Sequence, residues 1–307
     1  MNELRRYLVD EFVEDFQRGR LTRREALKLI AGLTGAGLAS QVLDAQAQGA
    51  ATPVHAGQAA QVLAVIAAVG VLADDPSIVA GPVKFAGEGA QLMGYLARPA
   101  KPGTFPIVLV CHENRGLTPH IEDVTRRVGK AGYVGLAVDL LSREGGTAQV
   151  SDPDRIPGLL GNAPPERHVR DFQSGLAYAK AQPFARADRV GMVGYCFGGG
   201  VTWRVTAAVP ELRAAVPFYG VPVQAGDVPR INAEVLAIYA GRDDRINQTI
   251  PAIEAAMRQN GKTFRKIVYP DVEHAFHNDT GARYNAEAAR AAWEQTLAWF
   301  ARTLQGA

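Results

Sequence analysis

The feature that most constrains the fold of this chain is an alternation of short apolar runs with amphipathic segments, which begins near Val83. The apolar runs are rich in Val, Leu and Ile and do not alternate strictly with polar residues, as is typical of strands buried on both faces. They cover residues 92–96, 107–110, 134–138, 190–193, 214–218, 235–239 and 264–269. Helices are expected at residues 121–130, 166–181, 199–208, 249–260 and 286–303. This order predicts an α/β fold with a mostly parallel sheet and helices on both faces.

The length of 307 residues accommodates one large α/β domain, expected at residues 81–307, together with a separate N-terminal part. The 33 basic and 31 acidic residues nearly balance, and the sequence has no block of Lys and Arg. Aromatic residues make up 7% of the chain. A nucleic-acid partner is therefore not expected, because both a basic patch and a base-stacking platform are missing from the sequence.

Residues 1–47 have the order of an export signal. The run 22–28 (TRREALK) precedes a short apolar stretch at 29–39, and Ala45-Gln46-Ala47 offers small residues for a signal peptidase. This resembles a twin-arginine (Tat) signal and implies the Tat machinery as a partner and a periplasmic location. The alternative is an amphipathic N-terminal helix in a cytoplasmic protein. Apolar residues recur at near-helical spacing for that helix at Tyr7, Leu8, Phe12, Phe16 and Leu21.

Neither part of the N-terminal region is expected to anchor the chain stably in a membrane. The apolar stretch at 29–39 is too short to span a bilayer. Residues 48–80 are rich in Ala, Gly, Gln and Pro, and we interpret them as a linker with one optional helix at 62–72.

The segment Gly194-Tyr195-Cys196-Phe197-Gly198-Gly199 joins the strand at 190–193 to the helix at 199–208. It matches the Gly-x-nucleophile-x-Gly elbow of the α/β-hydrolase fold, with Cys196 at the position where Ser is usual. The glycines let the strand and the helix approach closely around a strained turn. The start of the helix favours a thiolate, and the N–H of Phe197 is placed to bind a developing oxyanion. The alternative is a buried core cysteine beside a glycine turn.

The order nucleophile, acid, base is expected along a chain of this fold. Asp243 and Asp244 both follow the strand at 235–239, and either carboxylate could orient an imidazole, with Asp243 preferred. His274 follows the strand at 264–269 and is the expected base, with His277 as its competitor.

A metal site and a disulfide are both disfavoured by the sequence. The His and Cys residues show no Cys-x-x-Cys or His-Glu-x-x-His spacing. The two cysteines, Cys111 and Cys196, each have another explanation, so a bridge between them is not expected. We expect no metal and no cofactor.

Residues 80–305 resemble the dienelactone hydrolase family, also called carboxymethylenebutenolidase-like, on the strength of the motif Gly-Tyr-Cys-Phe-Gly-Gly. The resemblance implies a Cys–His–Asp triad on Cys196, His274 and Asp243, and the phrase Gly241-Arg242-Asp243 favours Asp243 over Asp244. It also implies that Glu113 interacts with the resting thiol, the alternative for Glu113 being a loop residue paired with Arg115.

The resemblance further implies that the loop amide near Asn114 completes the oxyanion hole. Arg143, in the phrase Asp139-Leu140-Leu141-Ser142-Arg143, matches one of two arginines that bind the substrate carboxylate in the family. Asn278 stands where the family has the second arginine, so a relative with a different substrate is expected.

These observations predict a hydrolase that cleaves a small carboxylic ester or lactone through a thioester on Cys196. Two alternatives remain open. The chain could be a ligand-binding or thiol redox-sensing module on the same scaffold, or it could transfer the acyl group to an acceptor other than water.

Overall fold

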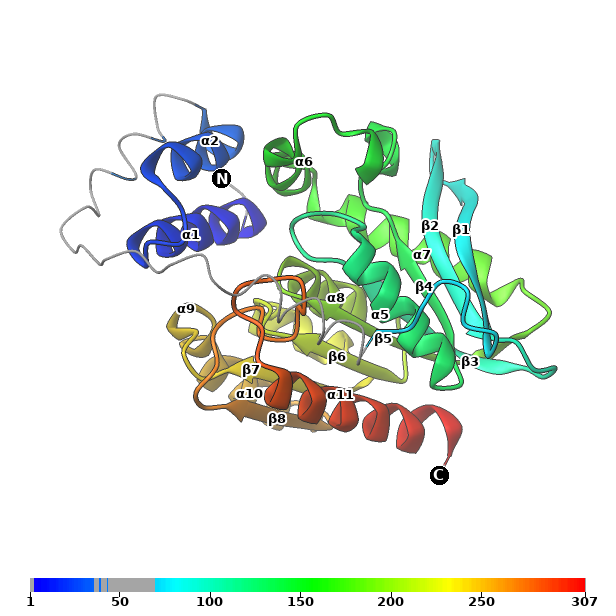
Figure 1. The fold of residues 1–307 in the computed structure, drawn as a ribbon. Coiled ribbons are helices and arrows are strands. Elements are labelled where there is room, and N and C mark those ends of the chain that lie inside the picture. The colour runs from blue at the N-terminus through cyan, green and yellow to red at the C-terminus, as the bar shows by residue number, and fades with distance from the viewer. Residues whose placement is uncertain (1–2, 36–38, 40–42, 44–69, 307) are drawn as a thin grey trace.

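The computed structural model describes residues 3–35, 39, 43 and 70–306 (Figure 1). Its centre is one eight-stranded sheet in the order β1-β2-β4-β3-β5-β6-β7-β8. The first pairings, β1 with β2 and β2 with β4, are antiparallel, and all the others are parallel. The strands are β1 (Ile78–Gly87), β2 (Ala90–Pro99), β3 (Phe105–Cys111), β4 (Val134–Val138), β5 (Ala185–Tyr195), β6 (Ala214–Phe218), β7 (Glu234–Ala240) and β8 (Phe264–Tyr269).

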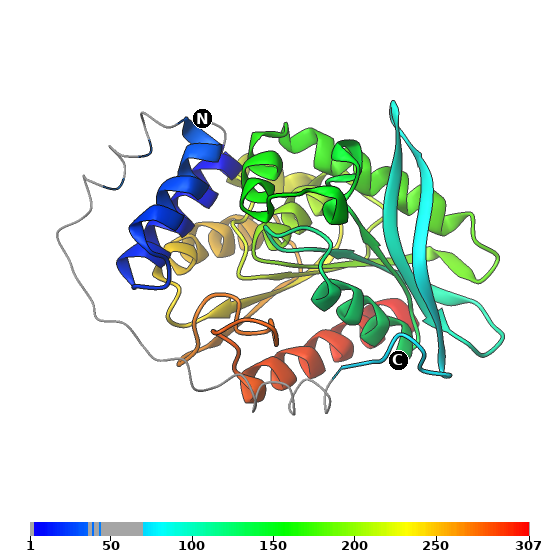
Figure 2. The ribbon, with the colours of Figure 1, turned by 45° about the horizontal axis from the view of Figure 1, so that its top comes forward.

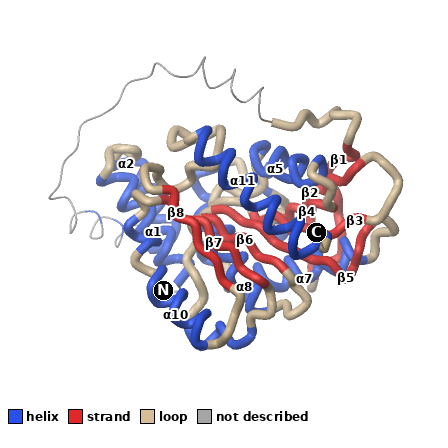
Figure 3. Tube along the Cα trace, turned by 90° about the horizontal axis from the view of Figure 1, so that it is seen from below, coloured by secondary structure: helices blue, strands red, loops and turns tan. Residues whose placement is uncertain are grey.

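Helices cover both faces of this sheet, with α5 and α11 on one face and α7, α8 and α10 on the other (Figure 3). The helices of the domain are α5 (Pro119–Lys130), α6 (Ile156–Asn162), α7 (Pro165–Lys180), α8 (Phe197–Ala208), α9 (Asp244–Asn247), α10 (Ile250–Gln259) and α11 (Ala286–Phe300). The central strand β3 is buried along its whole length, because layers of helix lie above and below it. The α/β-hydrolase architecture predicted from the alternation of apolar runs is therefore confirmed.

All seven predicted strands and all five predicted helices are present, with ends that differ by a few residues. Strand β1 and the short helices α6 and α9 were not predicted. Strand β1 lies at the sheet edge, where part of it is exposed, and it begins at Ile78, just before the domain start expected at residue 81. Helix α6 contains Pro157, Gly158 and Gly161, which individually disfavour helix, so no periodic signal marks it. The optional helix expected at 62–72 falls mainly outside the described residues.

An N-terminal helix is present, as expected from the amphipathic pattern. Helix α1 (Glu3–Gln17) is followed by α2 (Arg23–Thr34), and the two pack on each other and on α6 (Figure 2). Thr22 caps α2 in a reciprocal arrangement with Glu25, so the twin arginines Arg23 and Arg24 form the first turn of α2. Within the described ranges, none of the helices is both long and apolar enough to cross a bilayer. The export signal stays a prediction.

Candidate active site

The elbow between β5 and α8 holds Cys196 at the carboxyl edge of the sheet, with φ 58° and ψ −119°. A positive φ is strained for a residue with a side chain, and such strain is concentrated at functional sites. A Cβ on Gly194 would lie 2.3 Å from the carbonyl oxygen of Gly198. A Cβ on Gly198 would lie 2.4 Å from the carbonyl oxygen of His112. The glycines of the motif are thus required by close backbone contacts around the cysteine.

The thiol of Cys196 is buried at the N-terminus of α8. Burial raises the pKa of this thiol well above its usual value, and the carboxylates of Glu11 and Glu113 raise it further. Hydrogen bonds from Tyr7 and from the backbone of Phe197 act in the opposite direction but do not outweigh burial. In this arrangement the sulfur is therefore a protonated thiol, which is a weak nucleophile.

The imidazole of His274 and the carboxylate of Asp243 form a direct pair. Nδ1 of His274 lies 2.5 Å from Oδ2 of Asp243, and Oδ1 accepts a hydrogen bond of 3.2 Å from the N–H of Ile246. Burial raises the pKa of Asp243, but His274 and then Arg245 outweigh burial, so the net pKa of Asp243 is lowered. An ionised Asp243 keeps the proton on Nδ1 and leaves Nε2 free to accept one.

The alternatives to Asp243 and His274, namely Asp244 and His277, do not take part in this pair. Asp244 is exposed and begins the short helix α9. His277 is buried with its ring centroid 4.8 Å from that of Tyr195, and burial lowers its pKa well below the usual value. The structure therefore brings Cys196, His274 and Asp243 together.

Two side chains of the N-terminal helix enter this site. The Tyr7 hydroxyl lies 3.2 Å from Sγ of Cys196 and 3.3 Å from Nε2 of His274. Both carboxylate oxygens of Glu11 lie 3.7 Å from Sγ. Sγ, a ring nitrogen of His274 and a Glu11 oxygen all lie within 4.8 Å of one another. Helix α1 therefore supplies polar neighbours to both the candidate nucleophile and the candidate base.

Sequence reasoning did not identify Tyr7 and Glu11 as site residues. Tyr7 was counted among the apolar residues of an amphipathic helix. The signal that could have found the pair is the position of Glu11, one turn after Tyr7 and within the buried stripe that includes Leu8 and Phe12. A carboxylate on the apolar face of a helix needs a polar partner when the helix packs.

Glu113 and Asn114 lie in the loop after β3, beside the thiol. Glu113 accepts a hydrogen bond from the side-chain amide of Asn278, and the amide of Asn114 donates to Glu11 over 3.2 Å. The carboxylate in hydrogen-bond contact with the thiol is thus that of Glu11. The role predicted for Glu113 and the oxyanion role of the Asn114 N–H remain predictions.

A cavity of about 1190 Å³ opens next to Cys196, between α1 and the loops that carry the candidate site. Its lining is strongly charged and includes Arg115 and Arg283 as well as Glu11 and Glu113. Arg143 does not line it: the guanidinium donates to Asp171 over 2.8 Å and to the Glu88 carbonyl over 2.8 Å. No motif in the sequence marks Arg283, which lies in an irregular loop.

Among the described residues, Glu11, Cys196 and His274 are the group of ligand type close enough to hold a metal ion. The Tyr7 hydroxyl lies against both the sulfur and the imidazole, so hydrogen bonding already accounts for their proximity. Cys111 and Cys196 are both free thiols.

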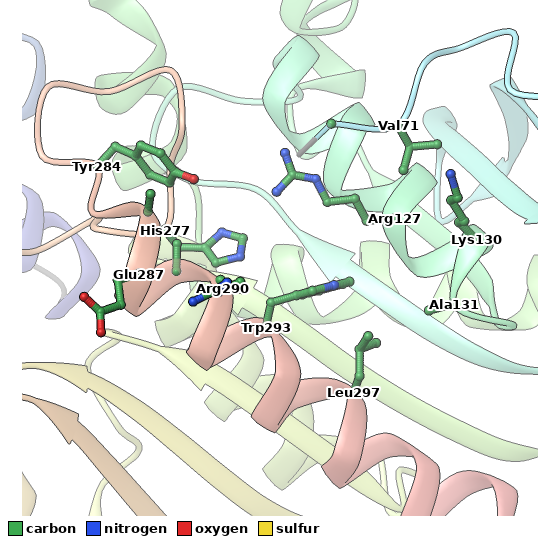
Figure 4. A pocket seen from close by; sticks show the side chains of 13 residues that line it. Val71, Arg127, Lys130, Ala131, His277, Tyr284, Glu287, Arg290, Trp293 and Leu297 are labelled. Atoms are coloured by element: carbon green, nitrogen blue, oxygen red, sulfur yellow. The ribbon is translucent and has the colours of Figure 1, made fainter. Parts of the chain in front are cut away.

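A second cavity, of about 750 Å³, lies between α5 and α11 (Figure 4). It is lined by Arg127, Tyr284 and Trp293, and by His277, whose Nδ1 has no hydrogen-bond partner in the described structure. Cys196 does not line this cavity, so it is separate from the candidate active site.

Comparison with known proteins gives a family for this chain. The model of the dienelactone hydrolase family matches residues 92–304. The chain therefore belongs to the dienelactone hydrolase family.

Individual relatives agree with this assignment. A protein of Methylorubrum extorquens named "Putative carboxymethylenebutenolidase" is 34% identical over 262 residues, which cover 81% of this chain and 90% of that protein. The crystal structure of a "Putative Dienelactone Hydrolase" from Klebsiella pneumoniae superposes with a TM-score of 0.69 at 33% identity, covering 73% of this chain and 99% of that one. A dienelactone hydrolase-like promiscuous phosphotriesterase from metagenomic libraries superposes with a TM-score of 0.65 at 25% identity, covering 74% and 99%.

Proposed function

We propose that this chain hydrolyses a carboxylic ester or lactone through Cys196, His274 and Asp243, with an acyl-enzyme thioester as intermediate. A hydrolase is the class that family membership supports. The observation that carries the residue assignment is the imidazole of His274, which is bonded through Nδ1 to a buried carboxylate and lies beside the elbow thiol. This arrangement matches the requirements for a nucleophile activated by an oriented base.

The reaction divides into acylation and deacylation. In acylation, Nε2 of His274 takes the thiol proton and Sγ attacks the carbonyl carbon, while the N–H groups of Phe197 and Asn114 bind the oxyanion. The bond from carbon to the leaving oxygen then breaks, and His274 returns its proton to that oxygen. In deacylation, His274 takes a proton from water, the water oxygen attacks the thioester, and the sulfur leaves with the proton. No cofactor enters this scheme.

Supporting roles follow from the same proposal. Glu113 would keep the resting thiol protonated, as its contribution to the raised pKa of Cys196 suggests. Arg143 would bind a substrate carboxylate only after its ion pair with Asp171 opens, because both its terminal nitrogens are already engaged. The charged cavity beside the thiol is the space available to the acyl part of a small substrate.

The test is a panel of esters and lactones hydrolysed by the wild type, Cys196→Ala and His274→Ala. Each of the two variants is expected to lose roughly 10³-fold or more in kcat/KM, since the two groups act as one unit. Cys111→Ala is the matched control, because Cys111 is the other buried thiol and lies outside the site. Hydrolysis that persists in Cys196→Ala would show that the nucleophile is another residue.

We also propose that residues 1–47 direct Tat-dependent export to the periplasm, because the twin arginines precede a short apolar stretch. N-terminal sequencing of the protein from separated cell fractions tests this proposal. A mature chain that starts near Gln48 in the periplasmic fraction is expected. An intact chain confined to the cytoplasm contradicts it.

A further inference from the structure

Helix α1 packs on the candidate active site through apolar side chains. Leu4, Leu8 and Phe12 are almost completely buried. Leu8 lies against α6, where a Cβ added to Gly161 would approach its Cδ1 to 2.9 Å. Such a continuous apolar contact indicates a defined docked position, because a loosely tethered segment would leave these side chains exposed.

Helix α2 also holds the N-terminal helices against the domain, through a contact with α6. A Cβ added to Gly158 of α6 would lie 2.9 Å from the carbonyl oxygen of Gly32 in α2. The two backbones therefore touch without intervening side chains. A larger side chain at Gly158 should therefore displace the N-terminal helices without altering a catalytic residue.

Around this apolar contact, ion pairs join the N-terminal segment to the rest of the domain. Asp15 of α1 pairs with Arg283 over 3.0 Å, and Glu14 pairs with Arg245 over 3.4 Å. Arg20, just after α1, pairs with Glu273, the residue directly before the candidate base. The N-terminal helix therefore binds to the catalytic loops themselves.

The Tyr7 hydroxyl occupies the position where a substrate would react. An attacked carbonyl carbon must come within about 3–3.5 Å of the nucleophile. The Tyr7 oxygen already lies 3.2 Å from Sγ and 3.3 Å from Nε2 of His274. A substrate carbonyl and the Tyr7 hydroxyl cannot both occupy this space, so hydrolysis requires α1 to withdraw.

The two contacts of the Tyr7 hydroxyl also match those expected of the leaving oxygen of an ester. That oxygen is bonded to the attacked carbon and receives the proton from the base, so it must lie near both Sγ and Nε2. The ring behind the Tyr7 hydroxyl is stacked under the guanidinium of Arg245, with 4.3 Å from Cζ to the ring centroid. An aromatic ring at this position is stabilised by cation–π attraction, and a saturated ring is not.

We propose that helix α1 is an internal inhibitor of the active site, and that its Tyr7 side chain occupies the subsite for the aromatic leaving group of an aryl ester substrate. The inference rests on the proposed function, since a leaving group presupposes ester cleavage. The inhibited state is the docked chain, and the active state is the chain from which α1 has left Cys196, either by withdrawal of the helix or by removal of residues 1–47.

The first experiment measures the accessibility of Cys196 in the full-length chain by iodoacetamide alkylation, with peptide mapping to separate Cys196 from Cys111. Two variants open the site in different ways: Tyr7→Ala vacates it, and Gly158→Leu forces α2 off α6. Each is expected to be alkylated at Cys196 roughly tenfold faster or more, because reactivity follows the fraction of open molecules. Arg6→Gln, at an exposed position of α1, is the matched control and should match the wild type.

The second experiment tests the subsite in Tyr7→Ala with a substitute for the missing side chain. 4-Methylphenol should refill the space and protect Cys196 from alkylation, whereas 4-methylcyclohexanol, with the same carbon skeleton, should protect severalfold less. Equal protection by the two compounds would overturn the assignment of an aromatic subsite. This readout does not require any ester to be hydrolysed.

Hydrolysis of phenyl acetate by the same variants separates the inference from the proposed function. Faster hydrolysis in Tyr7→Ala and Gly158→Leu than in the wild type supports the inhibitor. Unchanged alkylation, or a loss of hydrolysis in Tyr7→Ala, would overturn it and make Tyr7 a participant in the reaction. Faster alkylation without hydrolysis of any ester would leave the inhibitory contact standing and contradict the proposed function.

Discussion

The active site has two walls built in different ways. One wall consists of the elbow and the loops after β7 and β8, which hold Cys196, Asp243 and His274 at the carboxyl ends of parallel strands. The other wall is helix α1, which reaches the site from the far end of the sequence and is held by buried apolar side chains and a set of ion pairs. The first wall is formed by the loops of the central sheet, and the second is a separate helix that packs against them.

This difference indicates how the two walls respond to change. Substitutions in the strand loops remove chemistry or strain the fold, because their side chains are buried and hydrogen-bonded inside the domain. Substitutions in α1 shift an equilibrium between a docked and a withdrawn helix, and they are expected to increase the reactivity of Cys196. Substitutions in the strand loops should therefore remove activity, whereas substitutions in α1 should increase the reactivity of Cys196. These opposite effects distinguish the two walls.

The largest effect is expected from Asp243, the proposed acid of the site. In the Tyr7→Ala background, Asp243→Asn should reduce kcat/KM for an activated ester by roughly 10²–10⁴-fold, because an amide no longer holds the proton on Nδ1 of His274. Asp244→Asn is the control, since Asp244 is exposed and contacts neither His274 nor Cys196 in the structure. Equal losses in the two variants would show that the loop as a whole, and not the Asp243–His274 pair, is required.

A second effect concerns the framework behind the catalytic wall. Asp279 accepts hydrogen bonds from His120, over 2.8 Å, and from Arg127, and all three side chains are buried. Asp279→Asn should lower the free energy of unfolding by about 3 kcal/mol at pH 7, because the buried side chains of Arg127 and His120 then lose a carboxylate partner. Urea unfolding measures this loss, and Asp271→Asn, at an exposed position, should change it by well under 1 kcal/mol.

The pH dependence of that loss has a definite sign. Burial raises the pKa of Asp279, but the contacts with His120 and Arg127 outweigh it and hold the pKa well below its usual value. A carboxylate of this kind stabilises the fold above its unfolded pKa of about 3.9 and loses that contribution as the pH falls through the folded pKa. The difference between wild type and Asp279→Asn should therefore shrink in acid. A difference that grows below pH 4 would contradict the assignment.

A third effect tests the α1 wall through the thiol. Glu11→Gln removes a negative charge 3.7 Å from Sγ, so the pKa of Cys196 should fall and alkylation should reach half its maximal rate at a lower pH. The measurement is the rate of Cys196 alkylation between pH 6 and pH 10. Arg6→Gln removes a charge from the exposed side of the same helix and should leave the midpoint in place. A higher pH of half-maximal alkylation in Glu11→Gln would contradict the contact between Glu11 and Cys196.

The smallest effect is expected at the rim of the α1 wall. Arg20 pairs with Glu273 and Asp15, and all three side chains are partly exposed to solvent. Arg20→Gln should therefore weaken docking by no more than about 1 kcal/mol and raise Cys196 alkylation by up to about fivefold. Arg6→Gln, at an exposed position of α1, is the control. An increase in the alkylation rate as large as that of Tyr7→Ala would mean that the ion pairs of Arg20 control the docking of α1.

The catalytic wall could be predicted from the sequence because its signals are local. The glycines around Cys196 are required because a Cβ on Gly194 or Gly198 would lie 2.3–2.4 Å from a backbone carbonyl oxygen, and such a requirement is visible in a short motif. The loops that carry Asp243 and His274 follow apolar runs that predict strands, of which β7 is buried as expected. The expectation of a strand buried on both faces was wrong for β8, which lies at the sheet edge and is partly exposed. The same reasoning missed β1, whose partly exposed edge position gives a weak pattern.

The α1 wall could not be predicted in the same way. The amphipathic pattern of residues 7–21 predicted a helix with an apolar face but not the surface that the face covers, because docking depends on contacts between distant parts of the chain. Tyr7 lies 189 residues from Cys196 in sequence. Glu113 and Asn278 were each considered alone, and the hydrogen bond between them was not foreseen. Arg143 lies in a local ion pair that its sequence phrase does not reveal.

The most direct measurement is rapid-quench mass spectrometry of the Tyr7→Ala chain mixed with phenyl acetate. The arrangement of thiol, imidazole and carboxylate predicts a transient gain of one acetyl group on the peptide that contains Cys196, and no gain when Cys196→Ala is added to the same chain. Acetylation of a different residue, or unimpaired turnover in the doubly substituted chain, would contradict the assignment of Cys196 as the nucleophile.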